Sequence, residues 1–138
     1  MSKSNATELD FLNYTFKATA FPWNAVTNLD LHLHTADPGE AGLTTTSEGT
    51  YTSYALVQVS RSGTGWTVSS PGGVGTCSNA GIIQFPQCTG GTNTITHVSV
   101  APAGSTQILY SGALNSPLAV ANLVQPQFSI GALVFQED

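Results

Sequence analysis

Apolar and polar residues alternate along most of the chain after Pro22, and this period of two limits the possible folds more than any other feature. Leu29, Leu31 and Leu33 alternate with polar residues, and "SYALVQVSR", "ITHVSV" and "QILYSGAL" are further strand candidates. Successive side chains of a β-strand point to opposite faces, so such segments have one apolar face. Gly, Pro and Asn residues, which are typical of turns, separate them. The pattern predicts an all-β fold, an antiparallel, jelly-roll-like β-sandwich.

One short helix is expected at the N-terminus, within residues 5–20. Asn5 is followed three residues later by Glu8, the spacing of a helix N-terminal capping box, and Leu9, Leu12 and Phe16 fall on one side of a helix. The chain has 138 residues, enough for one hydrophobic core and too few for two. We therefore predict one β-sandwich domain, 1–138, with the helix packed at an edge or reaching out to a partner.

The charge of the chain argues against several classes of partner. Charged residues make up 8% of the sequence, the formal net charge is −5, and the cations are Lys3, Lys17 and Arg61. Three scattered cations cannot neutralise a run of phosphates, so no nucleic-acid binding is expected. No segment is long and apolar enough for a membrane span and the N-terminus does not resemble a signal peptide, so we expect cytoplasmic synthesis. Cys77 and Cys88 are then predicted to be separate thiols.

The stretch "LDLHLHTADPGE" at residues 29–40 raises the question of a metal site. If it begins as a strand, Asp30, His32 and His34 point to the face opposite the leucines, and three side chains that can bind metal share that face. The alternative is a half-buried strand whose polar face meets water or a partner, and the sequence favours this interpretation.

The histidine pair invites comparison with cupins, which hold a divalent metal with a His-x-His strand followed by an acid. Glu40 is the candidate for the acidic ligand, but five residues separate it from His34. Two of these, Pro38 and Gly39, are expected to turn the chain away from the histidines. Gln107 stands where a later histidine would be needed, and His97 is the remaining histidine. We expect no metal or other cofactor, and a cupin-like metalloenzyme is the second alternative.

Other catalytic patterns are missing from the sequence. There is no Gly-x-Ser-x-Gly elbow and no phosphate-binding loop that opens a helix. Paired carboxylates would have to come from Asp30, Asp37, Glu40 and Glu48, which are more typical of turns and caps. We therefore expect no catalytic residues and no enzymatic activity.

The order of several motifs resembles a family of small tailed-bacteriophage structural proteins that are often labelled tail-fibre proteins. The resemblance runs from about residue 8 to 136 and includes "FKATAF", "TSYALVQV", "GIIQF" and "GALVFQ". Its most specific parts are "TADPGEAG", "THV" and "LYSGAL", and a loop is inserted between Gly63 and Cys88. These proteins also resemble jelly-roll cement, or decoration, proteins of phage capsids. Long repeats or coiled coils, which build fibres, are not visible in the chain.

The resemblance implies a structural virion protein, namely a capsid cement protein that binds the major capsid protein on the outside of the head and stabilises joints between its subunits. The alternative is a tail-associated or receptor-binding component of the virion. A homodimer is the simplest object that bridges a twofold joint, with a trimer as the other possibility. The protein would be made in the host cytoplasm and reside on the capsid exterior.

The candidate interface residues lie in the N-terminal segment. Leu9, Leu12 and Phe16 provide an apolar stripe, and Phe21 and Trp23 flank Pro22 just after it. Large aromatic side chains are common anchors of protein interfaces. The alternative for Phe21 and Trp23 is packing of the helix on the sheet. Trp66 is expected in the core.

Overall fold

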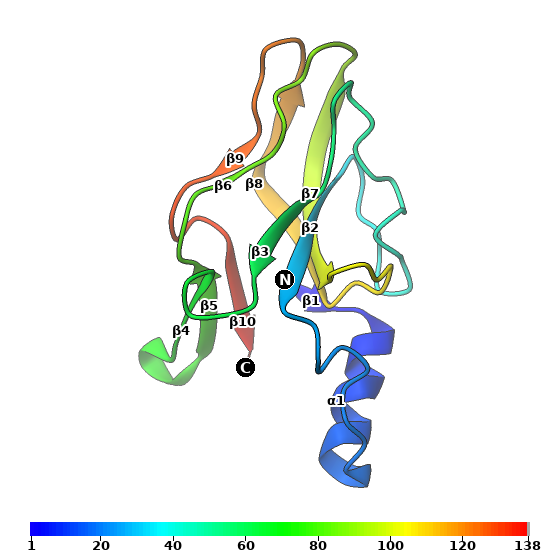
Figure 1. The fold of residues 1–138 in the computed structure, drawn as a ribbon, viewed down its shortest axis with the longest axis vertical. Coiled ribbons are helices and arrows are strands. Elements are labelled where there is room, and N and C mark those ends of the chain that lie inside the picture. Colours follow the sequence, from blue (N-terminus) through cyan, green and yellow to red (C-terminus); the bar gives the residue numbers. More distant parts are fainter. Residues whose placement is uncertain (138) are drawn as a thin grey trace.

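Short β-strands dominate the computed structural model, which describes residues 1–137 (Figure 1). The helix α1 (Asn5–Lys17) follows the first strand, and a 3₁₀ turn spans Pro71–Gly73. The strands are β1 (Ser2–Lys3), β2 (Asn28–His34), β3 (Val57–Ser60), β4 (Trp66–Ser69), β5 (Gly75–Asn79), β6 (Ile83–Gln84), β7 (Asn93–Pro102), β8 (Tyr110–Val120), β9 (Gln127–Phe128) and β10 (Val134–Glu137).

The strands form three antiparallel sheets. The largest has the order β1-β8-β7-β2-β3, so β2 is paired on both sides. The other two sheets have the orders β10-β5-β4 and β6-β9, and they lie on the same side of the large sheet (Figure 1). The predicted all-β sandwich with one N-terminal helix is confirmed.

One hydrophobic core fills the space between the large sheet and the small ones. Leu31 and Leu33 of β2 are buried there together with Val98 of β7, and Trp66 and Phe135 cover them from the three-stranded sheet. Burial of such side chains contributes on the order of 2 kcal/mol each. The expectation that Trp66 belongs to the core is confirmed.

The segment in which the resemblance places an inserted loop is largely ordered as a hairpin. Strands β4 and β5 pair with Val68 opposite Cys77, and β10 joins β5 on its other edge. The connection uses Gly72 and Gly73, whose φ angles of 64° and 90° favour glycine. Cys77 and Cys88 are both free thiols, as predicted.

The helix α1 differs from the sequence prediction at both ends. Its N-cap is Ser4, not Asn5, because the Ser4 side chain accepts a hydrogen bond from the Thr7 N–H and also donates to the carbonyl of Ile108. The helix ends at Lys17 rather than near residue 20, since Ala18 takes the left-handed conformation and its N–H bonds the Asn13 carbonyl. In Figure 1, α1 extends beyond the end of the sheets.

Candidate functional site

The polar face of β2 is buried, which corrects the expectation that it meets water or a partner. Asp30, His32 and His34 all lie on this face and have exposed fractions of 3%, 5% and 0%. For His32 and His34 the cause is the long connection between β2 and β3, residues 35–56, which folds back over the strand, whereas Asp30 contacts β3 and the turn after β7. The backbone of this connection bonds the strand end through the Thr35 N–H to Ser47 and the Gly49 N–H to Leu33.

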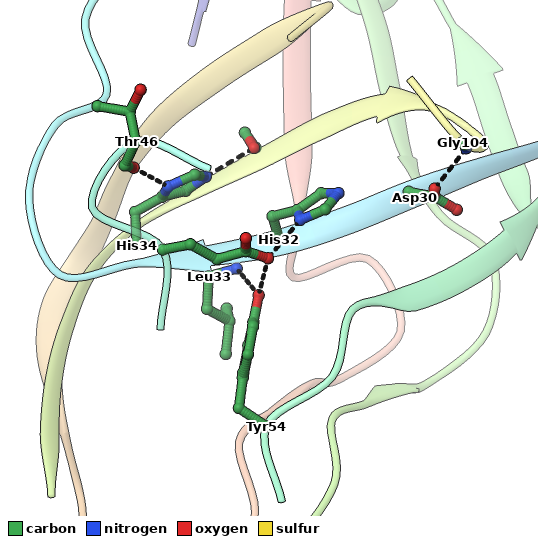
Figure 2. Close-up of polar contacts among 9 residues, drawn as sticks. Asp30, His32, Leu33, His34, Thr46, Tyr54 and Gly104 are labelled. Carbon is green, nitrogen blue, oxygen red and sulfur yellow. Dashed lines mark hydrogen bonds and ion pairs between the residues drawn. The ribbon is translucent and has the colours of Figure 1, made fainter. Parts of the chain in front are cut away.

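A carboxylate from this connection organises the centre of the buried face (Figure 2). Nδ1 of His32 lies 2.6 Å from Oε1 of Glu48, and the Tyr54 hydroxyl donates to the same oxygen at 3.0 Å. A carboxylate only accepts, so His32 donates from Nδ1. The Tyr54 oxygen also accepts from the Leu33 N–H. Leu33 has no partner in β3, because the pairing of β2 with β3 stops at Leu31 and Val57. Burial raises the pKa of Tyr54 well above 10, which keeps its hydroxyl a donor.

His34 and Asp30 flank this centre and are fully engaged. Nδ1 of His34 lies 2.8 Å from the Thr46 carbonyl, to which it donates, and Nε2 then accepts from the Ser99 hydroxyl at 2.7 Å. Burial lowers the pKa of His34 below its ordinary value of 6.5, and the ring is neutral. Asp30 accepts from the Gly104 N–H at 2.9 Å (Figure 2). It also accepts from the Gln58 side chain at 2.9 Å.

The residues weighed as metal ligands do not converge. Glu40 is exposed, and its carbonyl accepts from the Asn5 N–H. Gln107 bonds the side chains of Thr7 and Asp10. His97 does approach, because it pairs directly with His34 across β2 and β7. Even so, residues 1–137 contain no group of three His, Cys, Asp or Glu side chains that could hold a metal ion.

The buried network therefore holds a loop onto a sheet. Sequence reasoning did not identify Glu48 and Tyr54 as its central members. Glu48 follows His34 by fourteen residues, at no spacing that marks a ligand or a partner. The sole hint was that Glu48 is one of few acids in the chain.

The predicted interface stripe on α1 lies on the outer side of the helix. Leu9, Leu12 and Phe16 are 59%, 55% and 79% exposed. Residues advance by about 100° each around a helix, which puts these three roughly opposite Thr7 and Phe11. Thr7 is buried, and its hydroxyl donates to the Ile108 carbonyl, so the helix rests on the body by that side. The helix thus turns its apolar stripe away from its own body.

Phe21 and Trp23 are half-buried and join α1 to the sheets. The Phe21 ring stacks on Tyr14 at 4.7 Å and on Trp23 at 4.5 Å, and the Phe11 ring meets it edge-on. The Arg61 guanidinium lies over Trp23 and donates to the carbonyls of residues 23, 24 and 26. These contacts hold the connection between α1 and β2 in one conformation.

An apolar cleft that the sequence did not reveal opens between the large sheet and the three-stranded sheet. Its volume is about 580 Å³. The lining is mainly apolar and includes Leu29, Val68, Leu109 and Phe135, with Arg61 at its edge. The lining also includes the thiol of Cys77 and the side chains of Tyr110 and Glu137, which are hydrogen-bonded to each other.

Comparison with known proteins identifies the family. Within residues 1–137, no helix has the length and apolar character that a membrane crossing needs. No curated protein sequence matches the chain significantly. The family described as Podophage GP4 fiber I protein gp80 matches residues 2–136, which is almost the whole chain. The chain therefore belongs to the Podophage GP4 fiber I protein gp80 family of phage virion structural proteins.

Proposed function

We propose that this protein assembles into the virion through the outer face of α1, and that it acts as a cement protein on the outside of the head. The observation that carries the proposal is the exposed stripe of Leu9, Leu12 and Phe16 on a helix held to the body by its other side. Exposed apolar side chains gathered on one element are typical of contact surfaces. A surface with few charges also offers little repulsion between neighbouring proteins.

The compact β body supports a place on the head. A cement protein binds folded capsid subunits across their joints and gains strength from many copies, and no catalytic group is required for this. The partners would be the major capsid protein and a second copy of the chain. The buried network at His32 and Glu48 serves this role by keeping residues 35–56 fixed on the sheet.

A tail-associated role is the second candidate, and the family description favours it. The matching family is described as a fibre protein, which would place the chain in a fibre of the virion. The helix α1 has 13 residues and is too short to form a shaft by itself. In this role the chain would be a β domain at the base or tip of such a fibre.

Copy number per particle distinguishes the two roles. Quantitative mass spectrometry of purified virions, scaled to the major capsid protein, should find hundreds of copies for a head protein and a few tens at most for a tail protein. A virion lacking the protein would refute both. A phage carrying Leu12→Gln with Phe16→Gln should retain fewer copies per particle. The matched control is Ile82→Gln with Ile130→Gln, which changes two exposed isoleucines away from α1.

A further inference from the structure

The cleft between the large sheet and the three-stranded sheet has the size and lining of a small-molecule site. Its volume of about 580 Å³ lies within the roughly 300–1,000 Å³ that such pockets occupy. Val100 and Phe135 line it and are also members of the core, whereas Val68, which lines it as well, is 77% exposed. The cleft therefore leads from the surface to the hydrophobic core, and an apolar ligand would shield its walls from water.

A row of aromatic rings lines the cleft. The Phe135 ring meets the Trp66 ring edge-on, with centroids 5.8 Å apart, and meets the Tyr110 ring edge-on at 5.6 Å. The Tyr110 hydroxyl donates to Glu137, which also accepts from Lys3. These contacts fix the rings before any ligand arrives, which lowers the cost of ordering the site on binding.

Arg61 is the single cation among the lining residues, and it retains free hydrogen-bond donors. Its Nη1 group donates to the carbonyls of residues 23, 24 and 26. Within residues 1–137, its Nε and Nη2 groups have no hydrogen-bond partner, and no carboxylate forms an ion pair with it. Because an arginine can hold a carboxylate through two parallel N–H bonds, this cation is complementary to a carboxylate in the cleft.

The two ends of the cleft differ in charge. Arg61 precedes the turn that leads to Trp66, and Trp66 pairs with the last residue of β5. Glu137 pairs with the first residue of β5, which is about 13 Å from the last at roughly 3.3 Å per residue. The Glu137 carboxylate repels another carboxylate at its own end. A ligand with one carboxylate is therefore expected to place it beside Arg61.

We propose that the cleft binds a free medium-chain fatty acid, with its carboxylate on Arg61 and its acyl chain along the rings of Trp66, Phe135 and Tyr110. The mainly apolar lining disfavours sugars and nucleotides, whose polar groups would lose their hydration without gaining partners. One cation with free donors suits one carboxylate. The lining comes from the sheets and their connections rather than from α1, so this binding is independent of how the protein attaches to the virion.

Calorimetric titration of the purified full chain with decanoate tests the proposal. Decanoate should bind at one molecule per chain, and octanoate should bind roughly fifteenfold more weakly, because each buried methylene contributes about fourfold. Decanol has the same chain without the carboxylate and should bind at least about tenfold more weakly than decanoate, since it loses the charge-assisted hydrogen bonds. Equal binding of decanoate and decanol overturns the assignment of the carboxylate to Arg61.

Two matched substitutions locate the binding site. Val68→Glu adds a negative charge to the cleft and should weaken decanoate binding at least about tenfold, with little change in melting temperature because Val68 is exposed. Ile82→Glu adds the same charge at an exposed position outside the cleft and should bind like the unmodified protein. Arg61→Gln should bind decanoate and decanol about equally. If Arg61→Gln does not fold, the Val68→Glu and decanol results decide the question.

The Cys77 thiol provides a readout in the unmodified protein, because it lines the cleft. Bound decanoate should slow alkylation of Cys77 by iodoacetamide, followed by peptide mass spectrometry, and octanoate at the same concentration should slow it less. Failure of decanoate to bind, or binding that neither Val68→Glu nor Cys77 alkylation detects, overturns the proposal. If decanoate does not bind but phage carrying Val68→Glu retain fewer copies than phage carrying Ile82→Glu, the cleft instead receives an apolar segment of another virion protein.

Discussion

Nδ1 of His32 lies 2.6 Å from Oε1 of Glu48, and this contact ties the centre of the large sheet to the connection between β2 and β3. The same oxygen accepts from Tyr54, whose hydroxyl in turn holds the Leu33 N–H. One carboxylate thus satisfies two donors, a histidine and a tyrosine, at the edge of the core. Together with the backbone hydrogen bonds of Thr35 and Gly49, it joins the loop to β2.

Glu48→Ala should destabilise the fold. The substitution leaves the His32 and Tyr54 donors without an acceptor in a largely buried place, which costs about 2 kcal/mol or more. Denaturant unfolding followed by tryptophan fluorescence measures the change. The matched control is Glu40→Ala, an exposed acid whose side chain should matter by less than about 0.5 kcal/mol. Equal stability of the two variants would show that the network does not hold the loop.

Stability should fall as the pH drops below about 6.5, and His34 should cause part of the slope. Burial lowers the pKa of His34 in the folded protein below its ordinary value of 6.5. Below that value the unfolded chain binds a proton that the folded chain does not, so acid favours unfolding until the folded pKa is reached. His34→Asn should be less stable at neutral pH but should show a shallower dependence between pH 6.5 and 5. An unchanged slope in this variant would contradict the assignment.

The sequence predicts the strand that carries this network, but it does not predict most of the contacts within the network. The alternation of Leu29, Leu31 and Leu33 predicts β2 and the face on which Asp30, His32 and His34 lie. It cannot predict that both faces are buried, because the covering loop is held by contacts between residues far apart in sequence. Glu48 meets His32 across sixteen residues, and Ser99 meets His34 across sixty-five.

The sequence likewise predicts only part of the structure of α1. The spacing of Leu9, Leu12 and Phe16 predicts an apolar stripe correctly, but periodicity does not say whether a stripe faces inward or outward. The inner side is decided by polar anchors, since Thr7 bonds Ile108 and Asp10 bonds Gln107. The N-cap is Ser4 rather than the predicted Asn5 for the same reason, because the Ser4 side chain also bonds the body at Ile108. The local sequence of the helix does not indicate these distant hydrogen-bond partners.

Phe21→Ala with Trp23→Ala should lower the melting temperature of the free protein. Both rings are half-buried and form a stack with Tyr14, so their loss should cost on the order of 3 kcal/mol. Differential scanning calorimetry provides the measurement. Phe16→Ala is the control, because that ring is exposed and its loss should leave the melting temperature nearly unchanged. A normal melting temperature with poor retention on virions would instead make Phe21 and Trp23 interface anchors.

The two ends of the chain are joined by a contact that should respond to acid. Glu137 in β10 accepts from Lys3 in β1 at 2.5 Å and also from the Tyr110 hydroxyl. Burial by itself would raise the pKa of Glu137, but the hydrogen bonds from Lys3 and Tyr110 and the charge of Lys3 outweigh it and lower the pKa below 4.5.

Glu137→Gln should therefore cost less than about 1 kcal/mol, because the pair is partly exposed. A carboxyl group with a lowered folded pKa stabilises above its ordinary value, and this contribution disappears as the pH falls through the folded pKa. The difference in unfolding free energy between the two proteins should be largest at pH 7 and should shrink as the pH falls below 4.5, and added salt should reduce it. A difference that does not shrink with falling pH would exclude the carboxylate as its source.

Attachment through α1 can be tested by averaged electron cryo-microscopy density of the virion at the position of this protein. The outer face of α1, with Leu9, Leu12 and Phe16, should be buried against another protein chain while much of the β body faces solvent. Density in which α1 points into solvent and the sheets make every contact would contradict it.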